Sequence, residues 1–260
     1  MNKRLWSVYA CLCGLMISAL CTLPSRAQTP EVNRKPPMFT YLADWQIPRA
    51  NWPDMDKANS AGNAILEKAL ADGTIVGYGD DENLVHQPDA ETHDNWWSAM
   101  SLGGLIKVLD QFLASPGTTS PVLASATGHW DNIFISRYYN WHSGSYKSGY
   151  THISAYKMRP DAAGDAIDTL SQNMVVPLLE KMLADGTILE YEIDTQAIHT
   201  QEPGTFWIAY TAAKPEGLDK VQTAILDTLQ AHPLSGPAFD SMTDYGGHRD
   251  ELIQGDGTYK

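Results

Sequence analysis

The same short segment occurs twice in this chain, and this internal repeat constrains the fold more than any other feature. Residues 66–75 read LEKALADGTI and residues 179–188 read LEKMLADGTI, so nine of ten positions match at an offset of 113. Further matches follow in the same order: Tyr78 with Tyr191, Asp81 with Asp194, His86 with His199, Trp96-Trp97 with Phe206-Trp207 after a small gap, and 128–133 with 247–252. Each copy of such a repeat forms one supersecondary unit that buries its apolar face against the other copy.

Hydrophobic periodicity predicts the elements of each half. In the first half, apolar and aromatic runs indicate strands near 39–47, 74–78, 96–102 and 129–139, and helical spacing indicates helices at 55–71 and 103–114. The second half predicts strands near 150–158, 187–199, 205–212 and 248–254, and helices at 162–184 and 216–230. Pro177 should kink or divide the first of these two helices.

Each half therefore reads β-α-β-β-α-β, which is the ferredoxin-like order. Such a unit leaves one sheet face open, and a second copy is its simplest cover. The chain thus resembles the dimeric α/β-barrel superfamily, which includes antibiotic-biosynthesis monooxygenases, stress-responsive barrel proteins and chlorite dismutases. The resemblance rests on element order and duplication and implies an α+β fold, in which two ferredoxin-like units pack their antiparallel sheets as a pseudo-dimeric α/β barrel. The alternative is two ferredoxin-like domains side by side without a shared barrel.

The N-terminal segment predicts export. Lys3 and Arg4 precede an apolar run, and the small residues Ser25 and Ala27 suit a signal-peptidase site, so residues 1–27 read as a signal peptide. An uncleaved membrane anchor and a lipoprotein acylated at Cys21 are the alternatives. We expect a periplasmic or secreted protein, with a disordered lead-in at 28–37, a first repeat at 38–141, a linker at 142–148 and a second repeat at 149–260.

Cysteine content and charge exclude several classes of function. All three cysteines lie within residues 1–27, so the mature chain has no disulfide, thiolate nucleophile or cysteine metal ligand. Without Lys3, Arg4 and Arg26, 15 basic residues face 31 acidic ones, a net charge of −16. This charge argues against nucleic acid and anionic membranes as partners. Because one chain supplies both halves, we expect a monomeric pseudo-dimer.

Aromatic residues alternate along several predicted strands and so share one face. We expect this face to line the inside of the barrel, because a helix-covered surface favours aliphatic residues. It could be a pocket for a flat or apolar molecule, or a sealed aromatic core. The candidate ligand-binding residues are Tyr41, Trp45, Tyr78, Trp97, His152, Tyr156, Tyr191 and Trp207.

Two His-x-Asp pairs occur at matched positions, His129 with Asp131 and His248 with Asp250. Residues two apart on a strand point the same way, so each pair could ligate a metal, act as an oriented base, or form a structural hydrogen bond. We expect His86 to approach His248 and Asp250, and His199 to approach His129 and Asp131. His86, His129, His199 and His248 are the candidate metal ligands. The alternative places His86 and His199 in solvated loops.

Three classes of function follow from this reading. The first is an exported protein that binds a small apolar or aromatic molecule in the barrel. The second, implied by the resemblance, is a cofactor-independent or haem-dependent oxygenase-type enzyme, with His129, Asp131, His248 and Asp250 as candidate catalytic residues. The third is a non-catalytic structural or interaction module. The sequence leaves the ligand, any cofactor and any reaction unassigned.

Overall fold

The computed structural model describes residues 34–115 and 120–260. The predicted signal peptide and residues 28–33 of the predicted lead-in lie outside this range. Residues 34–37 are held against the barrel: the Lys35 amide donates to the Arg137 carbonyl at 2.8 Å, and the Tyr139 hydroxyl donates to the Pro36 carbonyl at 2.9 Å. These residues of the predicted lead-in therefore contact strand β4 (Gly128–Trp141).

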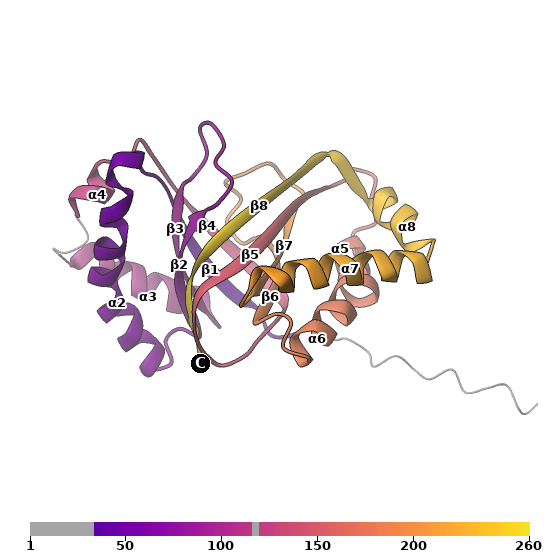
Figure 1. Ribbon diagram of the computed structural model, residues 1–260, viewed down its shortest axis with the longest axis horizontal. Helices are drawn as coiled ribbons and strands as arrows, with labels where there is room; N and C mark the ends of the chain where they lie inside the picture. Colours follow the sequence, from indigo (N-terminus) through magenta and orange to yellow (C-terminus); the bar gives the residue numbers. More distant parts are fainter. Residues whose placement is uncertain (1–33, 116–119) are drawn as a thin grey trace, which may run out of the picture. The chain divides into compact units, whose positions relative to one another are not determined.

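Eight antiparallel strands form one closed barrel (Figure 1). They are β1 (Met38–Gln46), β2 (Gly77–Asn83), β3 (His93–Ala99), β4 (Gly128–Trp141), β5 (Gly144–Met158), β6 (Glu190–Gln196), β7 (Thr205–Ala212) and β8 (Thr243–Tyr259). The predicted α+β class and the closed barrel are confirmed, and two separate side-by-side domains are excluded.

The order of strands around the barrel is the same in both halves. The sequence β4-β1-β3-β2 in the first half is followed by β8-β5-β7-β6 in the second. The halves join edge to edge, β2 to β8 and β6 to β4, so no sheet edge remains unpaired within the barrel. Each strand has one side chain face inside the barrel and one outside, under helices.

The helices of the first half cover the outer face of their own strands (Figure 1). They are η1 (Arg49–Asp54), α2 (Met55–Ala71), α3 (Leu102–Ala114) and α4 (Pro121–Ala124). Ser101 is the N-cap of α3, because its hydroxyl accepts a hydrogen bond from the Gly104 amide at 3.1 Å. The predicted ranges for α2 and α3 agree with the structure to within one residue, whereas η1 and α4 were not predicted.

The repeated Ala-Asp-Gly-Thr segment forms the same turn in both halves. Gly73 and Gly186 have φ of +78° and +76°, a conformation that side chains other than glycine rarely adopt. In each turn the aspartate before the glycine accepts from the amide of the threonine after it, at 2.9 Å for Asp72 and 3.0 Å for Asp185. The segment recurs because it ends a helix and aims the chain into the next strand.

The first helical region of the second half is divided, as Pro177 predicts. α5 (Ala166–Leu170) continues through a π-helical turn, η3 (Ser171–Val175), into α6 (Val176–Ala184). Proline has no amide hydrogen to donate to the preceding turn, which suits a wider turn just before it. The other helices of this half are α7 (Pro215–Ala231) and the unpredicted α8 (Ser235–Met242).

The predicted linker at 142–148 is mostly strand. β4 ends at Trp141 and β5 already begins at Gly144, where β5 pairs with the end of β8. None of the helices within residues 34–115 and 120–260 has the length and apolar character needed to cross a membrane.

Candidate functional site

A large cavity lies between the sheet and the helices of the second half. This helix-side cavity has a volume of about 1110 Å³. Its helical wall comes from η3, α6, α7 and α8, and most of the lining is apolar. Its sheet wall is formed by outward-facing residues of β5, β7 and β8: His152, Ser154, Tyr156, Ile208, Tyr210, His248 and Asp250. An apolar cavity with a few convergent polar groups is the usual form of a small-molecule site.

The polar groups of the helix-side cavity converge on Asp250. Its Oδ1 accepts a hydrogen bond from the Ser154 hydroxyl at 2.7 Å and lies 3.1 Å from Nε2 of His248. Nε2 of His152 is 3.7 Å from the same oxygen. Burial lowers the pKa of His152, and Asp250 partly offsets this effect. The arrangement can hold a neutral imidazole beside a carboxylate, which suits the acceptance of a proton.

Two tyrosines flank this polar group. The ring of Tyr156 stacks on His248 with 4.5 Å between centroids and an interplanar angle of 7°. Burial raises the pKa of Tyr210 to about 12, so its hydroxyl stays protonated and can donate to a ligand. The polar wall therefore offers both hydrogen-bond donors and proton acceptors beside an apolar space.

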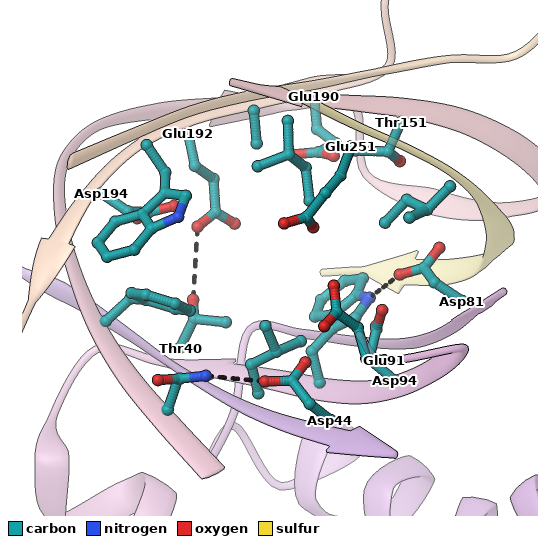
Figure 2. A pocket seen from close by; sticks show the side chains of 18 of the residues that line it. Thr40, Asp44, Asp81, Glu91, Asp94, Thr151, Glu190, Glu192, Asp194 and Glu251 are labelled. Carbon is teal, nitrogen blue, oxygen red and sulfur yellow. Dashed lines mark hydrogen bonds between the residues drawn. The ribbon is translucent and has the colours of Figure 1, made fainter. Parts of the chain in front are cut away.

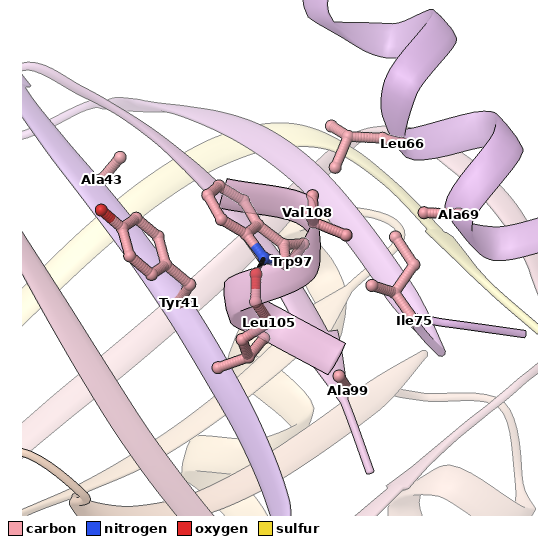
Figure 3. Packing of buried hydrophobic residues seen from close by; sticks show 9 residues of the cluster. All are labelled: Tyr41, Ala43, Leu66, Ala69, Ile75, Trp97, Ala99, Leu105 and Val108. Atoms are coloured by element: carbon pink, nitrogen blue, oxygen red, sulfur yellow. Dashed lines mark hydrogen bonds between the residues drawn. The ribbon is translucent and has the colours of Figure 1, made fainter. Parts of the chain in front are cut away.

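The matching face of the first half is filled with side chains (Figure 3). Tyr41 and Trp97 stack with 4.3 Å between ring centroids, and Phe112 of α3 packs on Trp97 at 5.4 Å. Trp45 stacks on His129 at 3.7 Å, as Tyr156 stacks on His248 in the other half.

The two His-x-Asp pairs do make contact, His129 Nε2 with Asp131 Oδ1 at 3.4 Å and His248 Nε2 with Asp250 Oδ1 at 3.1 Å. Nδ1 of His129 donates to the carbonyl of Asp44 at 2.9 Å. Only the second pair lines the helix-side cavity. A catalytic role for either pair stays a prediction.

The predicted placement of the aromatic face inside the barrel is wrong. Tyr41, Trp45, Tyr78 and Trp97 pack in the cluster beneath α2 and α3, outside the barrel. Tyr191 also faces outward, because its hydroxyl donates to Glu180 of α6 at 2.6 Å. The error came from assuming aliphatic residues under helices, whereas the small side chains Ala43, Ala69 and Ala99 leave room there for rings. Of the eight candidates, His152 and Tyr156 line the helix-side cavity and Trp207 lines the barrel interior.

The position of Trp207 follows from the strand register. In the first half, Trp97 pairs with Tyr41 and Tyr78 on the neighbouring strands. In the second half, the residue that pairs with their counterparts, His152 and Tyr191, is Tyr210. Tyr210, and not Trp207, is thus the counterpart of Trp97, at the same offset of 113 as the repeat. The gap placed in the sequence comparison was wrong: it grouped Trp207 with Trp97, which faces the helices, whereas Trp207 faces the barrel interior.

The matched histidines do not form shared metal sites. His86 lies against Trp52, with ring centroids 4.8 Å apart, and His199 is exposed. Within residues 34–115 and 120–260, no group of three or more His, Cys, Asp or Glu side chains is arranged to hold a metal ion. His86 therefore does not join His248 and Asp250 in such a group, nor does His199 join His129 and Asp131.

The barrel interior is lined by acidic residues instead of the expected aromatic face (Figure 2). We call them the interior carboxyl cluster: Asp44, Asp81, Asp94, Glu190, Glu192, Asp194 and Glu251. They surround a cavity of about 160 Å³ together with several aromatic rings. Sequence reasoning missed the cluster, although Glu190, Glu192 and Asp194 alternate along one strand, and Asp81 matches Asp194 in the repeat. That alternation was the available signal.

Burial raises the pKa of each member of the interior carboxyl cluster. The pKa reaches about 8 for Asp44, about 7 for Asp81, Glu190 and Glu251, and about 6 for Asp194. Repulsion from neighbouring carboxylates adds to the effect of burial. The side chains of β4, β5 and β7 that line this cavity are uncharged, for example Asn132, Tyr146 and Trp207.

Comparisons with known proteins show the fold. No family model matches the chain, and no curated protein matches it in sequence. A crystal structure of a provisionally named monooxygenase from Lactobacillus acidophilus NCFM has a TM-score of 0.58 at 11% identity, over 85% of this chain and 94% of that chain. A second, from Fusobacterium nucleatum subsp. nucleatum, has a TM-score of 0.56 at 6% identity, over 87% and 95%.

The structure of an anthrone oxidase-like protein has a TM-score of 0.50 at 10% identity, over 85% of this chain and 92% of that chain. These similar structures belong to the dimeric α/β-barrel superfamily. The architecture that the element order resembles is therefore present in this chain.

Proposed function

We propose that this protein binds a small, flat and mostly apolar molecule in the helix-side cavity of its second half. The observation that carries the proposal is the cavity itself, about 1110 Å³ of largely apolar space with its polar groups gathered around Asp250. Burial of a ligand's apolar surface would supply most of the affinity. His152, Tyr156 and Tyr210 would orient the ligand's polar end.

The proposal includes the origin and the location of the protein. The two halves are ferredoxin-like units that arose by duplication, which the repeated turns and the equal strand orders support. A single chain supplies both units and acts as a monomer. The basic, apolar and small-residue pattern of residues 1–27 supports export to the periplasm or beyond.

A fluorescent apolar amine, N-phenyl-1-naphthylamine, tests the binding proposal. Ile225 of α7 lines the helix-side cavity, so Ile225→Phe should fill part of it and weaken binding of the probe at least tenfold. Leu113→Phe on the exposed end of α3 is the matched control and should leave binding unchanged. Equal binding by the wild type and both variants would place the probe elsewhere and remove the support for this site.

An oxygenase-type enzyme using the same cavity is the second candidate. The observation that favours it is the pair of histidines on Asp250, and similar structures named as monooxygenases and an anthrone oxidase-like protein agree with it. His152 or His248 would take a proton from a hydroxyl group of the bound molecule. Asp250 would stabilise the imidazolium that forms. Tyr210 would donate to the oxygen that becomes negative.

A haem-dependent version of this enzyme also fits the residues present. His152, His232 and His248 all line the helix-side cavity, and any of them could hold the iron of a haem. Bound there, a haem would supply the oxygen or redox chemistry. Asp250 would then orient His152 or His248 through the second ring nitrogen.

An absorption spectrum and oxygen uptake with 1-naphthol distinguish these versions. A Soret band that is lost in His152→Ala or His248→Ala and retained in His129→Ala would establish the haem version. Oxygen uptake by colourless protein, reduced at least tenfold in His248→Asn and unchanged in His129→Asn, would support cofactor-independent chemistry. A colourless protein without uptake of oxygen would leave the binding function alone.

A further inference from the structure

The barrel interior presents many carboxyl groups and no positive charge to balance them. The interior carboxyl cluster comes from β1, β2, β3, β6 and β8, and none of the described residues that line this cavity is lysine, arginine or histidine. Six of the seven side chains are more than nine-tenths buried. Burying charges without a counter-charge is costly, so the interior must hold either protons or a cation.

Neutral donors satisfy only some of these carboxyl oxygens. Asn132 donates to Asp44 at 2.7 Å, and the indole of Trp96 donates to Asp81 at 2.9 Å. Figure 2 shows the hydroxyl of Thr40 on β1 reaching across the interior to Glu192 on β6, at 3.4 Å.

One oxygen in this region has no partner. The Asp94 side chain is only 5% exposed and is hydrogen-bonded to Asp81, but its Oδ1 accepts no hydrogen bond from an N–H or hydroxyl group. Asp94 is an inward-facing residue of β3 and lines the interior cavity. A buried carboxylate oxygen without a donor costs free energy, and a donor arriving in the cavity would recover it. This oxygen points to a missing ligand with N–H groups.

The other walls of the cavity suit an organic cation better than a metal ion. The carboxyl groups are not arranged around a common centre for a metal. The rings of Trp96, Phe134, Trp207 and Tyr259 stand between them. Aromatic faces attract ammonium groups and pack against methylene chains. The cavity of about 160 Å³ leaves room for a short chain and not for a bulky one.

We propose that the barrel interior binds a small organic diamine, whose ammonium groups pair with Asp94 and with carboxyls of β6 while its methylene chain lies against the rings. The ligand enters at the barrel end where Glu91 and the exposed Gln201 line the cavity. This site lies on the opposite face of the sheet from the helix-side cavity. The outcome of a test of diamine binding is therefore independent of whether the helix-side cavity binds a ligand.

Titration of the full-length protein with putrescine, followed by calorimetry and by thermal unfolding, tests the proposal. Ionic strength is held constant, because a chain of net charge −13 attracts any polyvalent cation weakly. Saturable binding with a stoichiometry of one is expected, with a rise in Tm. Asp94→Asn should weaken binding at least tenfold. Asp227→Asn on the exposed side of α7 is the charge-matched control and should bind like the wild type.

The unliganded Asp94→Asn variant should fold and unfold at a temperature no lower than that of the wild type, since burial raises the pKa of Asp94 and the amide replaces a neutral carboxyl of the same size. Its Tm should rise little with putrescine, which separates loss of binding from loss of folding. If this variant does not fold, Glu192→Gln replaces it. Non-saturable binding, or equal affinities in the interior and control variants, would overturn the proposal. A larger shift with Ca²⁺ or Mg²⁺ than with putrescine would overturn it in favour of a metal.

Discussion

The outer faces of the two half-barrels share one backbone arrangement, but side chains fill the space under the helices in the first half and leave a cavity in the second. Beneath α2 and α3, aromatic rings fill the space over the strands (Figure 3). Beneath η3, α6, α7 and α8, the matching face borders a cavity of about 1110 Å³. The two halves thus share one framework, in which one outer face has a packed core and the other borders a cavity.

Side-chain size at matched positions explains the difference. At the repeat offset of 113, Phe112 of α3 corresponds to Ile225 of α7, and Trp97 corresponds to Tyr210. Gly104 and Gly217 confirm the helix register, because a Cβ at each would meet the carbonyl of the repeat threonine and the last alanine of the preceding strand. Smaller side chains on α7 and on the strands leave open the volume that Phe112 and Trp97 occupy in the first half.

The largest expected effect is the loss of the central ring of the filled face. Trp97→Ala should lower the free energy of unfolding by about 3 to 5 kcal/mol, because a buried indole leaves a cavity that the packed helices cannot close. Tyr210→Ala should cost no more than about 2 kcal/mol, since that ring already borders open space. Urea denaturation measures both. Equal losses would show that the second face is as tightly packed as the first.

A smaller effect is expected from exchanging the matched helix residues. Phe112→Ile should cost about 1 to 2 kcal/mol, because apolar contact with Trp97 is lost. Ile225→Phe should change stability by less than about 1 kcal/mol, because the added ring enters empty space. Denaturation midpoints at equal m-values compare the two. A greater loss from Ile225→Phe would contradict the assignment of the cavity.

A dependence of stability on pH should separate the barrel interior from both outer faces. The pKa of Asp44 is raised to about 8 in the folded protein, so the folded state holds a proton that the unfolded state releases. Stability should therefore fall as the pH rises from about 4 to about 8. In the lower part of the range from pH 6.5 to 8.5 the buried His93, whose pKa is lowered to about 4, opposes this fall, because only the unfolded state binds a proton there, and it does so equally in the wild type and the variants.

Asp44→Asn removes the carboxyl that binds this proton and should therefore reduce the fall in Tm over pH 6.5 to 8.5. Asp227→Asn should leave the fall in Tm unchanged. Thermal unfolding in buffers of equal ionic strength provides the measurement. A flat Tm for the wild type over this range would mean that the interior carboxyls are solvated or already paired with a cation.

The sequence by itself determined the duplicated element order, the ends of the main helices and the division of a helix before Pro177. These features depend on local signals, namely periodicity, the glycine turns and the missing amide of proline. The closed barrel followed from them, because two open sheet faces need a cover.

Only the tertiary structure decided which strand face is inside. Alternation sorts residues into two sets, and it does not say which set meets helices. In this chain the rings of Tyr41 and Trp97 face the helices, and the carboxyls of Glu190 and Glu192 face inward. The cavity was equally hidden from the sequence, because its volume depends on the sum of side-chain sizes across elements distant in the chain. Local patterns fix the direction of each residue, whereas packing between elements decides what each residue meets.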